Sequence, residues 1–96
     1  MRTYELMTIH RPEMAEPEFR GKVEEIGALL TARGATPSDT ELWGKRRFAY
    51  EIDHGNEGYY SVISFETESA DVLSDLDRAL GLSDAVIRHK VVRTDA

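Results

Sequence analysis

The chain has 96 residues, of which 41% are hydrophobic and 31% charged, with a formal net charge of -6 and no cysteine. This length predicts a single domain over residues 1–96, and the composition excludes a disordered polar tract. The lack of cysteine excludes a disulfide framework and a thiolate metal site, and the charged start lacks the apolar core of a signal peptide. We therefore expect a soluble cytoplasmic protein that does not associate with a membrane.

The first third of the chain predicts a strand followed by a helix. Residues 2–10 are rich in aromatic and branched side chains and are short enough for one strand. A helix is expected over residues 16–33, because Pro17 suits a first helical turn and apolar residues then recur at spacings of three and four. Gly34, directly after this segment, is typical of a helix stop.

Two strands joined by a polar loop come next. Residues 40–52 predict a long strand after a turn at residues 35–39, and Gly44 inside this strand is typical of a bulge. A polar loop over residues 53–58 leads into a third strand at residues 59–66. These two strands are expected to form a hairpin.

The last third predicts a second helix and a fourth strand. The helix is expected between Ser69, as its N-cap, and Gly81, with leucine and valine side chains at helical spacing between them. Residues 86–93 predict the fourth strand. This order favours an α+β, ferredoxin-like βαββαβ fold, a four-stranded antiparallel sheet with two helices on one face and the other face open.

Strand alternation sorts side chains between the helix-covered face and the open face of the predicted sheet. Eight side chains of the last three strands are expected to face the core. They are Phe48, Tyr50, Ile52, Ile63, Phe65, Ile87, His89 and Val91. Gly44 leaves the side taken by Arg46 undecided, because a bulge changes the strand register.

The open face is expected to combine cationic side chains with aromatic and apolar ones. Its members are Lys45, Arg47, Arg88, Lys90, Trp43, Tyr60 and Val62. This mixture suits phosphates and unpaired RNA bases, and it equally suits a protein partner. The acidic residues are concentrated in and beside the two helices, so the net negative charge does not exclude an RNA surface on the sheet.

The sequence offers little for catalysis or metal binding. His10, His54 and His89 lack the helical spacing of metal ligands, so no metal site is predicted. Arg11 and Glu13 are explained as charged residues of a turn. Nucleophile motifs, phosphate-binding glycine loops and paired catalytic carboxylates are not found, so no catalytic residue and no cofactor are predicted.

Four blocks of the sequence resemble one known family. Residues 44–52, GKRRFAYEI, are similar to the signature strand of the bacterial small-subunit (30S) ribosomal protein S-six family. Residues 1–5 (MRTYE), 57–60 (EGYY) and 85–93 (AVIRHKVVR) resemble the same family, with matching spacing between the blocks. The resemblance covers essentially the whole chain and implies the same ferredoxin-like fold.

The resemblance implies a structural component of the small ribosomal subunit. Such a protein binds the central domain of small-subunit ribosomal RNA together with small-subunit ribosomal protein S-eighteen, and we expect the free chain to be a monomer. The residues implied to contact RNA are Arg2, Lys45, Arg46, Arg47, Arg88, Lys90 and Arg93. Those expected to pack against the protein partner are Trp43, Tyr60 and Val62.

Two other functions remain open from the sequence alone. A small enzyme of the dimeric ferredoxin-like barrel type would pack two open sheet faces together, and His10 or His89 would then line a pocket. A specialised paralogue would keep the fold without joining the ribosome.

Overall fold

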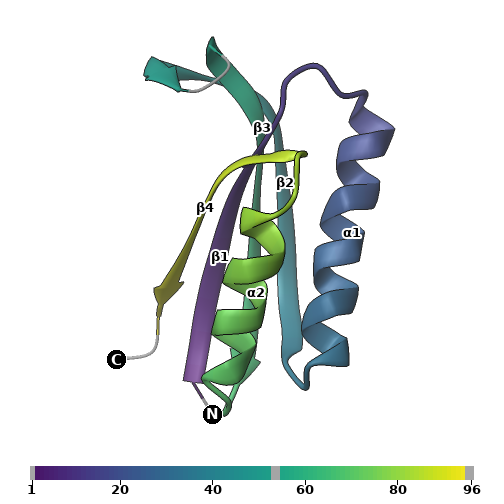
Figure 1. The fold of residues 1–96 in the computed structure, drawn as a ribbon, viewed down its shortest axis with the longest axis vertical. Coiled ribbons are helices and arrows are strands. Elements are labelled where there is room, and N and C mark those ends of the chain that lie inside the picture. Colours follow the sequence, from purple (N-terminus) through teal and green to yellow (C-terminus); the bar gives the residue numbers. More distant parts are fainter. Residues whose placement is uncertain (1, 53–54, 95–96) are drawn as a thin grey trace.

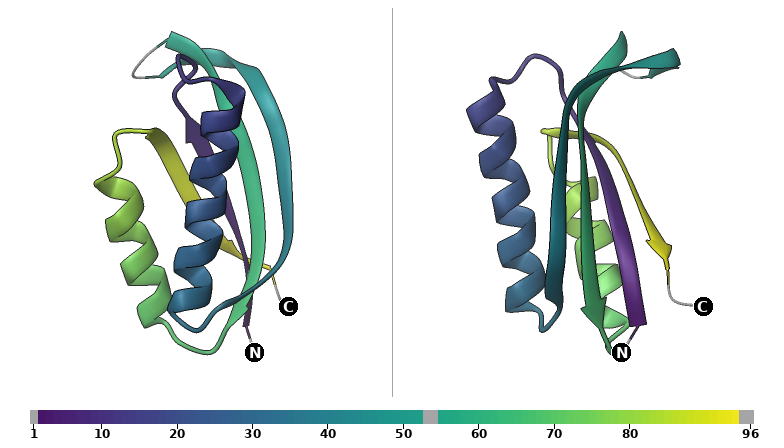
Figure 2. Two further views of the ribbon diagram at one scale, coloured as in Figure 1. Left: turned by 90° about the vertical axis from the view of Figure 1, so that its right-hand side faces the viewer. Right: turned by 180° about the vertical axis from the view of Figure 1, so that it is seen from behind.

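A computed structural model describes residues 2–52 and 55–94, and the side chains of all of these except 48–52, 55 and 56. The elements are β1 (Arg2–His10), α1 (Glu16–Ala32), β2 (Thr36–Ile52), β3 (Gly55–Thr67), α2 (Asp71–Gly81) and β4 (Val86–Arg93), as Figure 1 shows. They form a four-stranded sheet in the order β2-β3-β1-β4, with each neighbouring pair antiparallel. Both helices lie on one side of this sheet (Figure 2). The predicted ferredoxin-like fold is confirmed.

One cluster of buried apolar side chains joins the helices to the sheet. The strands contribute alternate residues, because successive side chains point to opposite faces. They are Tyr4, Leu6, Tyr59, Ile63 and Phe65. The helices contribute residues at spacings of three and four, which are Phe19, Val23, Ile26, Leu30, Val72, Leu76 and Leu80. Each such side chain contributes about 1.5–3 kcal/mol when it is fully buried, so this cluster is the main source of stability.

A local hydrogen bond stabilises the C-terminal end of α1, and another stabilises the start of α2. Gly34 ends α1 with a φ of 90°, which glycine adopts without a steric penalty. In this conformation the Ala35 N–H donates to the Leu30 carbonyl at 2.9 Å. At the start of α2, Ser69 Oγ accepts from the Asp71 N–H at 3.2 Å, although the N-cap residue is Ala70. Neither helix of the described residues is long and apolar enough to cross a membrane.

Two predicted loop segments belong to strands. β2 begins at Thr36, so the predicted turn over residues 35–39 is wrong. Pro37 is tolerated there because β2 lies at the edge of the sheet and its register shifts before Asp39. β3 begins at Gly55, so most of the predicted loop over residues 53–58 is strand as well.

A bulge in β2 decides which side chains reach each face. Leu42 pairs with Ser61 and Gly44 pairs with Tyr60, so Trp43 is an extra residue between them. Gly44 has a φ of 80°, and it is the residue that lets the chain make this bulge. The bulge predicted at Gly44 is confirmed. The predicted core positions of Phe48, Tyr50 and Ile52 lie outside the described side chains.

A second irregularity shifts the start of β4 by one residue. Ile9 pairs with Arg88 and His10 pairs with Val86, so Ile87 is left between two pairs. Val86, and not Ile87, packs against the core cluster. The predicted core position of Ile87 is therefore wrong, whereas those of Ile63, Phe65 and Val91 are confirmed.

Two glycine substitutions should have opposite effects on stability. Gly44→Ala should lower the free energy of unfolding by about 1 kcal/mol, because a Cβ is strained at positive φ. Gly21→Ala, within α1, should raise it by about 0.5–1 kcal/mol, because alanine favours the helix and nothing lies within 4 Å of the added Cβ. Urea unfolding of both variants measures the difference, and equal effects would contradict the strain at Gly44.

Candidate functional site

The open face of the sheet consists of rows of side chains that lie opposite one another across the strands. The row nearest the β2–β3 hairpin contains Gly44, Tyr60, Ile9 and Arg88. The next row contains Glu41, Val62, Met7 and Lys90, and the third contains Asp39, Ser64, Glu5 and Val92. Strands lie about 4.8 Å apart, so each row is about 15 Å wide. Positive charge thus occupies the hairpin end of this face, and negative charge increases away from it.

Trp43 and Tyr60 form a stacked aromatic pair at the hairpin end. Their ring centroids are 5.9 Å apart and the ring planes differ by 14°. Trp43 Nε1 donates to the Glu41 carboxylate at 3.4 Å, which holds the indole beside the strand. The side chain remains 45% exposed, so it offers a large surface to a partner. The predicted positions of Trp43 and Tyr60 on the open face are confirmed.

Arginine side chains border this aromatic pair. Arg46 pairs with Gly58, on the open side, and its Nε donates to the Trp43 carbonyl at 3.1 Å. Arg46 and Arg47 line a surface hollow of about 450 Å³ together with Trp43 and Tyr60. The structure therefore settles the side of Arg46, which the sequence left undecided.

Lys45 lies on the opposite side of the sheet from the predicted one. It pairs with Tyr59, whose ring stacks on Phe19 of α1 at 4.8 Å in the core. Lys45 Nζ lies 5.3 Å from the centroid of the Tyr59 ring, a cation–π contact. The predicted open-face position of Lys45 is wrong, because the bulge at Trp43 reverses the alternation of the residues that follow it.

Arg47 follows the same alternation as Lys45, since it pairs with Glu57. Its side chain nevertheless borders the hollow on the open side. The pairing of β1 with β3 ends at His10 and Tyr59, so β2 and β3 continue beyond it as a two-stranded ribbon. Such ribbons twist more strongly than wider sheets, and the two faces are less distinct there.

Two apolar side chains form the centre of the open face. Val62 is 9% exposed and Ile9 is 5% exposed, although no helix covers this side of the sheet. Val62 is on the predicted face, but its side chain is almost fully buried among its neighbours on that face. Ile9 was missed by the sequence analysis, because its side is known only once its register with Tyr60 is known.

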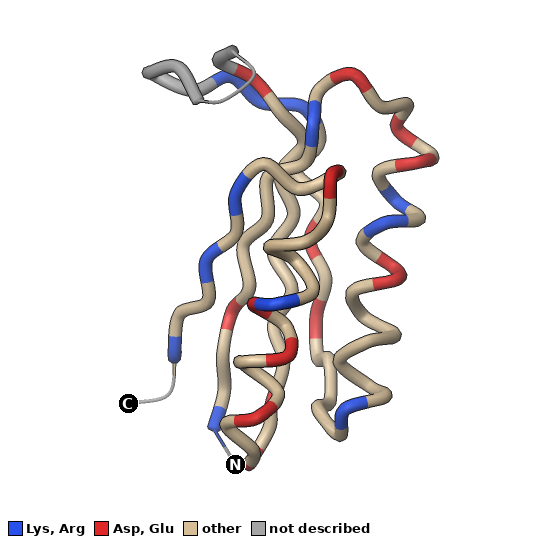
Figure 3. Tube along the Cα trace, viewed as in Figure 1, with Lys and Arg blue, Asp and Glu red and all other residues tan. Residues whose placement is uncertain are grey.

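The remaining basic residues fall into two groups. Arg88 and Lys90 are exposed and project from the open face, as predicted. Arg2 pairs with Thr67, and Arg93 pairs with Tyr4, so both lie toward the far end of β1 and on the helix side. Figure 3 shows Lys and Arg along β4 and at the hairpin, and Asp and Glu along both helices. The structure thus gathers four of the seven predicted RNA-contacting residues, which are Arg46, Arg47, Arg88 and Lys90.

Comparison with known proteins identifies the family. The family model described as Ribosomal protein S6 matches residues 3–93. Small ribosomal subunit protein bS6 of Beutenbergia cavernae is 41% identical over 96 residues, which cover 100% of this chain and 99% of that protein. The chain belongs to the ribosomal protein S6 family. The resemblance seen in the four sequence blocks is confirmed.

Further members of the S6 family support the assignment. Small ribosomal subunit protein bS6 of Caldanaerobacter subterraneus is 38% identical over 95 residues, covering 99% of each chain. The crystal structure of 30S ribosomal protein S6 from Thermotoga maritima is 33% identical, with a TM-score of 0.91 over 97% of this chain and 87% of that chain. The C-terminal domain of the MgtC protein from Mycobacterium tuberculosis, 18% identical with a TM-score of 0.53, shares the fold alone.

Membership of the S6 family excludes one of the two alternatives left open by the sequence. The relatives are ribosomal structural proteins, so this chain has a structural role and is not an enzyme. The barrel-type enzyme is therefore excluded. Within the described residues, no three side chains of the metal-binding types form a group that could hold a metal ion.

Two histidines of this S6-family chain lie on the helix side of the sheet. His89 Nε2 lies 2.8 Å from Asp77 Oδ1 of α2. His10 is fully buried, packs edge-on against Phe19 at 5.2 Å, and has no hydrogen-bond partner for either ring nitrogen within the described residues. Burial, and next the positive charge of Lys22, lower the pKa of His10 to about 4. His54 lies outside the described residues.

The buried His10 should make the protein sensitive to mild acid. Its pKa is lower in the folded chain than the 6.5 of a free histidine, so only the unfolded chain binds the proton between these values. The free energy of unfolding should fall by about 2 kcal/mol from pH 7 to pH 5 on account of this group.

His10→Leu should remove that part of the pH dependence. Urea unfolding at the two pH values measures it, with His89→Gln as the matched control that keeps His10. The prediction fails if His10→Leu and the unsubstituted chain lose the same stability between pH 7 and pH 5.

Proposed function

We propose that this chain binds the central domain of small-subunit ribosomal RNA together with ribosomal protein S-eighteen. It would do so as a non-catalytic structural component of the small subunit, in the ribosome of the bacterial cytoplasm. The observation that carries the proposal is the hairpin end of the open face, where cationic side chains from β2 and β4 surround the Trp43–Tyr60 pair.

The cationic side chains supply the RNA contacts. Arg46 and Arg47 border the hollow, and Arg88 and Lys90 project from β4 across the same face. Guanidinium and ammonium groups at such spacing neutralise phosphates of a folded RNA, and the contact depends on shape as well as on charge. On the open face itself, the negative charge at the far end directs the RNA contact to the hairpin end.

The aromatic pair supplies the contact with the protein partner. Interface centres are enriched in Trp, Tyr and Arg, and a stacked pair presents a large rigid surface at low entropic cost. In this proposal Trp43 and Tyr60 pack against S-eighteen, together with Val62 in the adjacent row of the same face. The free chain is a monomer, because burying the exposed Arg88 and Lys90 against a second copy would cost their solvation.

Arg2, Lys45 and Arg93 are proposed to contact RNA separately. They are exposed, but their strand partners are Thr67, Tyr59 and Tyr4, which place them on the helix side. These three residues therefore reach a different segment of the folded RNA from the one at the hairpin end.

Filter binding of a central-domain RNA fragment tests the function. The chain alone should bind weakly, because few cationic side chains face the RNA. Addition of S-eighteen should increase the affinity by about tenfold or more, within the usual range of coupling between two ligands. Absence of RNA binding both with and without S-eighteen would exclude the proposal.

The salt dependence of the complex tests the hairpin arginines. The double substitution Arg46→Ala and Arg47→Ala should lower the slope of log affinity against log salt by about 1.5, because about 0.7–0.9 counterions are released per phosphate contact. The double substitution Arg20→Ala and Arg33→Ala is the matched control, since both arginines form exposed ion pairs away from the open face. An unchanged slope in the first variant would assign Arg46 and Arg47 a structural role.

A further inference from the structure

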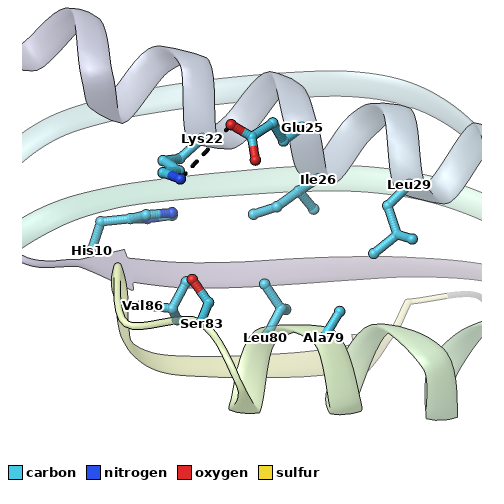
Figure 4. Close-up of a pocket in the computed structure, with 9 residues that line it drawn as sticks. All are labelled: His10, Lys22, Glu25, Ile26, Leu29, Ala79, Leu80, Ser83 and Val86. Atoms are coloured by element: carbon cyan, nitrogen blue, oxygen red, sulfur yellow. Dashed lines mark ion pairs between the residues drawn. The ribbon is translucent and has the colours of Figure 1, made fainter.

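A cavity of about 270 Å³ lies between the two helices, on the side of the sheet opposite the open face. Figure 4 shows α1 above it, α2 below it and β1 behind it. Most of its wall is apolar and comes from both helices and from the start of β4. The apolar side chains are Ile26, Leu29, Ala79, Leu80 and Val86. A cavity of about 150 Å³ with such a lining holds a benzene molecule, so this one has room for a substituted ring.

His10 forms the polar end of the cavity. Neither ring nitrogen has a hydrogen-bond partner within the described residues, and the side chain is fully buried. With a pKa of about 4, the imidazole is neutral at pH 7 and offers one donor and one acceptor. A buried polar group without a partner is costly, and a ligand that supplies the missing hydrogen bond recovers this cost.

The charges at the rim favour an uncharged ligand. Lys22 Nζ and Glu25 Oε2 lie 3.9 Å apart on α1, so one charge of each sign borders the opening. The C-terminal end of α2 also borders the cavity, and the negative end of its helix dipole disfavours an anion. A cation would meet Lys22, and an anion would meet Glu25 and the α2 terminus.

We propose that this cavity binds a compact, uncharged ring compound with one hydroxyl group, such as a phenol or a cyclic alcohol. The ring lies among the apolar side chains, and the hydroxyl group forms a hydrogen bond with His10. A hydroxyl both donates and accepts, so it matches either nitrogen of the neutral imidazole.

Lys22 controls access to His10. In Figure 4 the Lys22 side chain reaches over the His10 ring toward Glu25. The Lys22 side chain is 39% exposed and that of Glu25 is 71% exposed, and an ion pair between exposed side chains contributes little stability. Lys22 can therefore swing outward and let the hydroxyl reach the ring at little cost.

Binding of phenol, with benzene as the matched probe, tests the proposal at pH 7. NMR titration of the full chain should shift the resonances of Ile26, Leu29 and Leu80 on adding either probe. Phenol should bind about fivefold more tightly than benzene, which corresponds to one net hydrogen bond. Equal affinities for the two probes, or no shift at these residues, would overturn the proposal.

Three variants locate the site. His10→Leu should bind phenol and benzene equally, whereas His89→Leu, the same change on the same side of the sheet but outside the cavity, should keep the preference for phenol. Ala79→Trp fills the cavity from an exposed position of α2 and should abolish binding of both probes. Retention of the phenol preference in His10→Leu, or of phenol binding in Ala79→Trp, would overturn the proposal.

Discussion

The composition of the open face of the sheet depends on the bulge at Trp43 and Gly44. One extra residue in β2 leaves Trp43 on the open side but turns Arg46 toward that side and Lys45 toward the core side. The Trp43 carbonyl accepts a hydrogen bond from Arg46 Nε, and the Trp43 indole stacks on the Tyr60 ring. Regular alternation would place Lys45 next to Trp43 on the open face, so this single departure from strand geometry puts Arg46 there in its place.

The second determinant is the separation of charge between the layers of the fold. The helices cover one face of the sheet and are acidic, with seven Asp and Glu against three Lys and Arg, whereas β4 and the hairpin carry basic residues. A chain with a net charge of -6 can therefore present a positive surface over one end of the open face. In the proposed complex the same acidic groups disfavour RNA along the helices, so the charge pattern would give orientation as well as affinity.

The helix side contains a different kind of feature, a buried polar group in an otherwise apolar layer. His10 lies at the end of β1, where the sheet, α1 and the segment after α2 meet. A folded protein rarely leaves a buried imidazole without a partner, because the lost hydrogen bonds with water are not replaced. This cost, together with the adjoining cavity, distinguishes His10 from His89, which has Asp77 as its partner.

The sequence by itself determined the fold class, both helices, the strands at the two ends and the family, because periodicity, helix-stopping residues and the four sequence blocks are local features. It also placed Trp43 and Tyr60 on the open face. It could not place Lys45 or Ile87. Gly44 indicated a bulge, but only strand pairing shows which residue is inserted, and one inserted residue reverses every later side chain. Only the tertiary structure decided these faces and the cavity at His10, since register and the approach of two helices arise from packing between distant segments.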